Sequence, residues 1–292
     1  MFFLQLTFSG MCLGAVYALV AHGFNITFAT SKVVNFAHGP FLMIGVMLTL
    51  TFLGSGLPMA LAIILGLAST AVLGYILERV SVRPLLKSPT SMGWVVSTLG
   101  AGIILQAFAS EVWGVQAIGF PAYIFESTDY VRLFNVQISL QLLMIFLVSL
   151  AIMVIFEFLL GKTLWGKAFK ATARDSDLAR LMGIKTKMIV SVSFMISTGL
   201  AALAGVMLAP VTGVDPAFGM DLMIKGFIAA VIGGMGSSKG AVAGGITLGV
   251  LEMLVGGYIS TIARNGLAFV ALITMLAVRP NGIFGSREVV KV

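Results

Sequence analysis

Charged side chains are almost missing from the first 77 residues of this chain. Lys32 separates two runs, residues 2–31 and 33–77, that contain no Asp, Glu, Lys or Arg. A helix needs about 20 apolar residues to cross the hydrocarbon core of a bilayer. A soluble chain carries about 25% charged residues, whereas this one of 292 residues is 10% charged and 59% hydrophobic. The sequence therefore predicts an all-α membrane protein that crosses the bilayer several times.

The apolar runs predict about eight or nine transmembrane helices in one polytopic bundle. The run 33–77 is too long for one helix and is broken at Gly54-Ser55-Gly56-Leu57-Pro58. Further spans are expected at 91–112, 136–160, 188–210, 222–238, 240–260 and 266–279. We expect residues 1–292 to form a single transmembrane domain.

The positions of Lys and Arg predict the orientation, because cytoplasmic loops carry an excess of these residues. If the polar stretch 161–187 lies inside, all of the 18 Lys and Arg residues fall in inside regions except Arg132, Lys225 and Arg264, which we assign to the outside. This bias requires an odd number of spans, with the N-terminus outside and the C-terminus in the cytoplasm.

Two segments interrupt the apolar pattern. One is Asn35-Phe36-Ala37-His38-Gly39-Pro40, and the other is IGGMGSSKGAVAGG at 232–245. Short segments interrupted by Gly or Pro in the two halves of a transporter indicate discontinuous helices beside a translocation path. Segments 35–45 and 226–245 are therefore candidates for re-entrant or broken helices, with Asn35, His38 and Gly236 as candidate path residues. Tight turns at the membrane surface are the alternative.

Glu252 lies inside the expected span 240–260. A carboxylate at mid-bilayer costs roughly 2.5–3.5 kcal/mol on insertion scales. It should therefore face the bundle interior or a partner subunit, and it joins the candidate path residues.

Pairs of glycines at a spacing of four residues favour close packing of helices in lipid. These pairs are Gly10 with Gly14, Gly240 with Gly244, and Gly245 with Gly249.

No catalytic motif is found in the sequence. Gly161-Lys162-Thr163 resembles the end of a phosphate-binding loop, but that loop needs a glycine five residues before the Gly-Lys pair, and Phe156 stands there. The sequence contains no His-Glu-x-x-His, no Gly-x-Ser-x-Gly and no Cys/His cluster. We expect a protein that is not an enzyme and that has no cofactor, no metal and no nucleic-acid partner.

The stretch 161–187 holds seven Lys and Arg residues. Leu164, Trp165, Ala168 and Phe169 share one helical face, which suits a helix at the membrane interface. A second, shorter helix follows, and Gly183 is expected to end it.

Asp175 or Ser176 can cap the start of this shorter helix, and Leu178, Leu181 and Met182 form an apolar ridge on it. So short a helix is unstable alone. It must pack either on the ends of its own bundle or in a groove on a cytosolic partner.

The sequence resembles the permeases of branched-chain amino acid ABC importers, also called hydrophobic amino acid uptake transporters, and in particular the shorter of their two permeases. The resemblance lies in five stretches that together extend over nearly the whole chain. They are GAVYALVAHGFNITF (14–28), NFAHGPFLMIG (35–45), GKAFKATARDSDLARLMGI (166–184), GGMGSSKGAVAGGITLGVLE (233–252) and VRPNGIFG (278–285).

The resemblance implies a permease domain in a bacterial inner membrane that passes a branched-chain or other hydrophobic amino acid into the cytoplasm. An extracytoplasmic binding protein would deliver the substrate, a second homologous permease would complete the path, and two cytoplasmic ATPases would drive it. Residues 161–187 would then be the cytoplasmic coupling loop that docks on an ATPase. The positions that match the family's coupling pattern are Arg174, Asp175, Ala179, Leu181 and Gly183. Lys170 stands where such motifs often carry arginine.

Two alternatives stay open from the sequence. Related importers carry urea, short amides or aromatic acids. The second alternative is an ATP-independent secondary transporter or channel. Such a protein more often carries several membrane-embedded acids, whereas Glu252 is the clear membrane-embedded acid in this sequence.

Overall fold

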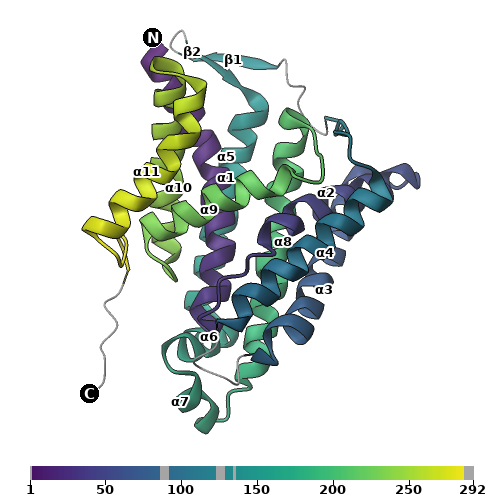
Figure 1. The fold of residues 1–292 in the computed structure, drawn as a ribbon, viewed down its shortest axis with the longest axis vertical. Helices are drawn as coiled ribbons and strands as arrows, with labels where there is room; N and C mark the ends of the chain where they lie inside the picture. The colour runs from purple at the N-terminus through teal and green to yellow at the C-terminus, as the bar shows by residue number, and fades with distance from the viewer. Residues whose placement is uncertain (1, 86–91, 123–128, 134–135, 286–292) are drawn as a thin grey trace. The chain divides into compact units, whose positions relative to one another are not determined.

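The computed structural model describes residues 2–85, 92–122, 129–133 and 136–285 (Figure 1). Within these residues the chain is largely helical, with one short antiparallel pair of strands, β1 (Tyr130–Leu133) and β2 (Val136–Ser139), in which Tyr130 lies opposite Ser139. Three of the basic residues used to predict orientation, Lys87, Arg287 and Lys291, lie outside the described residues.

Seven helices in the described part of the chain have the length and the apolar composition to cross a membrane. They are α1 (Phe2–Ser31), α3 (Met59–Leu77) continued by the π-helix η1 (Glu78–Val82), α4 (Gly93–Trp113), α5 (Leu140–Lys162), α8 (Thr186–Thr212), α10 (Ser238–Tyr258) and α11 (Thr261–Val278). Two helices are shorter: the apolar α2 (His38–Gly54) has 17 residues, and α9 (Phe218–Gly233), which contains Asp221 and Lys225, has 16. The predicted polytopic helix bundle is confirmed, and the orientation of its termini stays a prediction.

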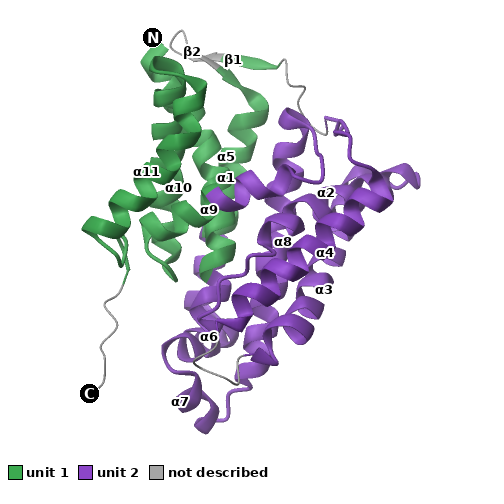
Figure 2. Cartoon of the chain, viewed as in Figure 1, with its two compact units in different colours: residues 1–25, 128–153, 225–292 green, residues 26–127, 154–224 purple. Residues whose placement is uncertain are grey.

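The chain divides into two compact units, which are coloured separately in Figure 2. Unit 1 contains residues 1–25, 128–153 and 225–292, and unit 2 contains residues 26–127 and 154–224. Residues of α1, α5 and α9 are divided between the two units. The single domain predicted over residues 1–292 stays a prediction.

Unit 2 is built on α8, which packs on both α2 and α3, while α2 also packs on α4 (Figure 1). Met43 and Met47 of α2 are fully buried with Val206 and Ala209 of α8 in one hydrophobic cluster. Thr198 of α8 donates a hydrogen bond to the Thr70 carbonyl of α3 at 3.3 Å. Small and flexible side chains thus let three helices approach closely, as expected for packing in lipid.

In unit 1, two of the predicted glycine pairs face each other where α1 crosses α10. A Cβ atom at Gly14 would lie 2.6 Å from the Gly245 carbonyl oxygen and 2.7 Å from Ile246 Cα, and one at Gly249 would meet the backbone of Gly10 and Gly14. Only glycine allows this contact between the two backbones, which explains the spacing seen in both helices.

Both predicted interruptions are breaks between helices. Residues 32–37 separate α1 from α2, and Lys32 there has a left-handed φ of 58°. Residues 234–237 separate α9 from α10, and Gly234 and Gly236 have φ values of 108° and 84°.

Two of the basic residues assigned to the outside lie in helices. Lys225 is inside α9 and Arg264 is near the start of α11. Both side chains pair with Glu252, so each has a structural reason to lie within a helix.

We predict that Gly14→Ala destabilises unit 1. The added methyl group would overlap the backbone of α10, and overpacking of this kind costs about 1–3 kcal/mol. Thermal unfolding of the purified chain in detergent should show a lower midpoint. Gly100→Ala in α4 is the matched control, because a Cβ atom there would have no neighbour within 4 Å. Equal midpoints for the two variants would contradict the close crossing of α1 and α10.

Candidate functional site

The polar stretch 161–187 folds into two helices and the start of α8. The first is α6 (Leu164–Arg174), capped by Thr163, whose hydroxyl accepts a hydrogen bond from the Gly166 amide at 3.0 Å. Trp165 and Phe169 of α6 pack edge-on against Phe156 of α5, with ring centroids 6.2 and 6.5 Å apart. The predicted interfacial face of α6 is therefore packed largely on protein, although Leu164 stays 83% exposed.

The second helix, α7 (Ser176–Leu181), is held at both ends by hydrogen bonds. Of the two candidate caps, Asp175 is the one used, and its Oδ1 accepts from the amides of Asp177 and Leu178 at 3.0 Å each. At the other end Gly183 has φ 82°. The amides of Gly183 and Ile184 donate to the carbonyls of Arg180 and Ala179, each at 3.0 Å, which is a Schellman ending.

The apolar ridge of α7 faces away from the rest of the described chain. Leu181 and Met182 are each 83% exposed and Leu178 is 55% exposed, whereas Ala179 is buried on the opposite side. The helix contacts α6 and the start of α8 through that buried side (Figure 1). The six residues of α7 and its C-cap Met182 thus form a small projection with three exposed apolar side chains.

The five residues of the coupling pattern lie along this one segment and have different tasks in it. Arg174 ends α6, Asp175 caps α7, Ala179 anchors α7, Leu181 is on the exposed ridge, and Gly183 closes the helix.

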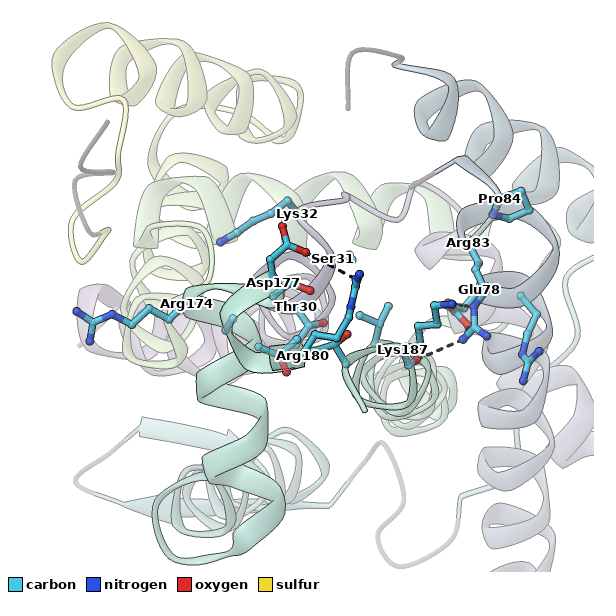
Figure 3. Close-up of a pocket in the computed structure, with 16 residues that line it drawn as sticks. Thr30, Ser31, Lys32, Glu78, Arg83, Pro84, Arg174, Asp177, Arg180 and Lys187 are labelled. Carbon is cyan, nitrogen blue, oxygen red and sulfur yellow. Dashed lines mark hydrogen bonds and ion pairs between the residues drawn. The ribbon is translucent and has the colours of Figure 1, made fainter. Parts of the chain in front are cut away.

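A cavity of about 970 Å³ lies beside α7 (Figure 3). Its lining comes from the ends of α1, η1 and α6, from α7, and from the start of α8. Arg180 and Asp177 lie on one side of it, and Arg83 and Glu78 lie on the other (Figure 3).

An ion pair at this cavity was missed by the sequence reasoning, which treated Arg83 as an ordinary cytoplasmic charge. Glu78 is 1% exposed and binds Arg83 through two hydrogen bonds of 2.9 and 2.8 Å. Ser191 of α8 donates to Glu78 at 2.9 Å, and Arg83 donates to the Ser191 hydroxyl at 2.6 Å. The two residues are five positions apart, a spacing that brings side chains together in the i→i+5 geometry of a π-helix such as η1 but not in an α-helix, where neighbours are three or four apart.

Among the candidate path residues, Asn35 and His38 lie together in unit 2. Both are fully buried, and the Asn35 Oδ1 accepts from the Ala37 amide at 3.1 Å. The His38 Nδ1 lies 3.4 Å from the Ser197 hydroxyl of α8. The Asn35 Nδ2 has no hydrogen-bond partner among the described residues, so a buried donor is available beside the break before α2.

Gly236 belongs to unit 1, where three of the quoted stretches meet. Its amide donates to the Asn25 Oδ1 at 3.0 Å, and the Asn25 Nδ2 donates to the Ser237 carbonyl at 2.8 Å. The amides of Ile283 and Phe284 donate to the carbonyls of Ile232 and Gly233 at 2.9 Å each. Gly236 therefore belongs to a turn that is held by hydrogen bonds to the side chain of Asn25, which we call the fastened turn.

Glu252 is fully buried in unit 1 and has three partners. Tyr17 donates to its carboxylate at 2.8 Å, and Lys225 and Arg264 each lie 3.4 Å from it. Lys225 also lies over the Tyr17 ring, 5.8 Å from its centroid. The sequence offered no signal for these pairings, because the four residues come from four different helices.

The four candidate path residues are divided between the two units. Asn35 and His38 belong to unit 2, whereas Gly236 and Glu252 belong to unit 1. Gly236 precedes the first turn of α10, and Glu252 lies roughly 21 Å further along that helix at 1.5 Å per residue.

Comparison with known proteins identifies the family. Residues 6–278 match the model of the branched-chain amino acid transport system / permease component. The high-affinity branched-chain amino acid transport system permease protein LivH of Salmonella typhimurium is 34% identical over 307 residues, which cover 100% of this chain and 98% of the relative. LivH of Escherichia coli K12 is 33% identical with the same coverage.

BraD of Pseudomonas aeruginosa, a permease protein of the same kind of system, is 32% identical over 99% of this chain and 98% of its own length. No solved structure matches the chain significantly. The match extends from α1 to the end of α11 and includes the capped helix α7 and the fastened turn at Gly236. The chain belongs to the family of branched-chain amino acid transport permeases.

Proposed function

We propose that this chain is a permease subunit of an ATP-driven ABC importer. The observation that carries the proposal is α7, a helix rigidly capped at both ends with its apolar ridge uncovered, on a chain whose sequence lacks a phosphate-binding loop. Exposed Leu181 and Met182 suit an apolar groove on a partner, because an amphipathic helix binds through such anchors. The partner would be a cytoplasmic ATPase, which supplies the energy.

An importer of this kind would also contain the other subunits that the family resemblance implies. A second homologous permease would complete the transport path, two ATPases would dock on the pair, and an extracytoplasmic binding protein would deliver the substrate. The complex would lie in a bacterial inner membrane with the N-terminus of this chain outside and its C-terminus in the cytoplasm. The relatives are named for branched-chain amino acids, so a branched-chain or other hydrophobic amino acid is the proposed substrate.

Urea, short amides and aromatic acids are alternative substrates for an importer of the same type. Within unit 2, Asn35 is the best placed candidate for contact with substrate, because its buried amide donor has no partner among the described residues. This donor suits an acceptor such as a carboxylate or an amide carbonyl, so it does not by itself select among these classes.

The buried acids disfavour a secondary transporter. Glu252 is paired with Lys225 and Arg264, and Glu78, a second buried acid that the sequence reasoning did not recognise, is paired with Arg83. A secondary transporter more often carries several membrane-embedded acids that are open to the coupling ion, whereas both of these acids are already bound by basic side chains.

Hydrogen bonds connect α7 to the membrane helices of unit 2, so a movement of α7 would be passed on to them. The Ala179 carbonyl bonds the chain just before α8 begins, and Ser191, in the second turn of α8, bonds Glu78 of η1. Arg83 also donates to the Lys187 carbonyl of α8 at 3.3 Å. Docking of a partner at α7 would therefore shift the positions of α8 and of the α3–η1 helix together.

Reconstitution tests the proposed function. Proteoliposomes should take up labelled leucine when they contain this chain, its permease partner, the ATPases and the binding protein with ATP inside. Omission of the ATPases should abolish uptake. Uptake of leucine by this chain alone without ATP would contradict the proposal.

We predict that Leu181→Asp uncouples the assembled transporter. A charge on the exposed ridge should cost at least about 2 kcal/mol of docking energy, as loss of an interface anchor does, and substrate-stimulated ATP hydrolysis should be lost. Leu164→Asp is the matched control, because Leu164 is exposed to the same extent but lies on α6. Both variants should reach the membrane at normal levels. Normal coupling in the Leu181 variant would count against docking at α7.

We predict that Glu252→Gln lowers uptake more than it lowers stability, if this carboxylate lines the path. The change leaves Lys225 and Arg264 without their acid, so some loss of stability is expected. Tyr17→Phe is the matched control, since it removes one hydrogen bond to the same carboxylate and keeps all charges. Uptake and the thermal midpoint should be measured for both. A parallel loss of the two quantities would assign Glu252 a structural role.

A further inference from the structure

The cavity beside α7 is strongly basic. Among its lining residues are six cations, Lys32, Arg79, Arg83, Arg174, Arg180 and Lys187, and two acids, Glu78 and Asp177. Each acid already has a partner in the same lining, because Glu78 binds Arg83 and Asp177 lies 3.7 Å from Arg180. The cavity therefore has a formal excess of positive charge before any ligand is bound.

Four of the cations have no acid partner in the described part of the chain: Lys32, Arg79, Arg174 and Lys187. Lys32 and Arg79 instead lie over the rings of Phe28 and Tyr75, at 5.7 and 5.4 Å from the ring centroids. An aromatic contact leaves the charge uncompensated, and like charges that share a cavity repel one another. An anion in the cavity would remove this repulsion.

The location of the cavity indicates the source of the anion. It lies where three membrane-length helices have their ends: α1 ends at Ser31, the α3–η1 helix ends at Val82, and α8 begins at Thr186. The ends of helices of this length lie at the depth of the lipid headgroups. Basic pockets at this depth on the cytoplasmic side bind phosphate-bearing headgroups, because that leaflet is anionic.

The size of the cavity also fits such a headgroup. Its volume of about 970 Å³ lies at the upper end of the roughly 300–1,000 Å³ that is typical of small-molecule sites. Arg83 and Lys187 come from the η1 and α8 side, and Arg180 comes from α7 (Figure 3). A group bound among them would contact both the membrane helices and the projecting helix.

We propose that this cavity binds the phosphate headgroup of an anionic phospholipid and thereby fixes α7 against the ends of α1, η1 and α8. The binding itself does not depend on the proposed transport function. The consequence for coupling does depend on it, since a bound lipid would set the position from which Leu181 and Met182 project.

The test uses the full chain, purified in detergent, and native mass spectrometry with phosphatidylglycerol or phosphatidylcholine. The chain should retain phosphatidylglycerol and not phosphatidylcholine. The double variant Lys32→Gln/Lys187→Gln should bind phosphatidylglycerol about 30-fold more weakly, roughly fivefold for each lysine. These two residues are outside the proposed coupling pattern, and Arg174 is left unchanged because it belongs to that pattern.

The matched control is Lys167→Gln/Lys170→Gln, which removes the same charge from exposed positions of α6 that do not line the cavity. It should bind phosphatidylglycerol as well as the unmodified chain. An equal loss in the two double variants would overturn the proposal, since binding would then follow net charge. Unchanged binding in the Lys32/Lys187 variant would overturn it as well.

Two further arms separate the other anions. Inorganic phosphate at millimolar concentration should not displace the lipid, and displacement would assign the cavity to a free anion. The lipid should also remain bound when the ATPases are added to the permease. Its release on assembly would assign the cavity to an acidic segment of the ATPase instead. Lipid binding is measured without transport, so its failure can be distinguished from a failure of the proposed importer function.

Discussion

The main constraint on this chain is that hydrocarbon offers no partner for a backbone amide or carbonyl. Helices satisfy these groups internally, so every break between apolar helices needs a substitute. At the break between α9 and α10 the substitute is the amide side chain of Asn25, which bonds the Gly236 amide and the Ser237 carbonyl. At the break before α2 it is Asn35, whose Oδ1 bonds the Ala37 amide. The segments that interrupt the apolar pattern are thus fastened by specific side chains.

Buried charge follows the same logic. A carboxylate removed from water is stable only when it is paired and hydrogen-bonded. Glu78 has Arg83 and Ser191, and Glu252 has Tyr17, Lys225 and Arg264. Each set joins different helices within its own unit, so each also fixes how those helices pack. Removal of the acid from such a set leaves its basic partners uncompensated, which is more costly than the loss of the contact itself.

Much of the fold was predictable because apolar length and local caps are properties of the sequence alone. The spans, the break at Gly234–Ser237, the cap at Asp175 and the ending at Gly183 all rest on residues close to one another in the chain. What failed depends on distant partners. The pairing of Lys225 and Arg264 was not predicted because their common partner, Glu252, lies on a third helix. Glu78 and Arg83 were missed because their spacing of five residues matches a π-helix.

The segment around α7 shows how these constraints bear on the proposed coupling. A helix of six residues cannot hold its shape in water by backbone bonds alone, so α7 depends on Asp175, on the Gly183 ending and on buried Ala179. The cap, the helix ending and the buried contact hold α7 in place, and Leu181 and Met182 stay exposed on it. The same short segment leads directly into α8, where Ser191 meets the buried Glu78–Arg83 pair. The exposed ridge is therefore connected to α8 and to the α3–η1 helix by hydrogen bonds, and this is the connection that the proposed coupling would use.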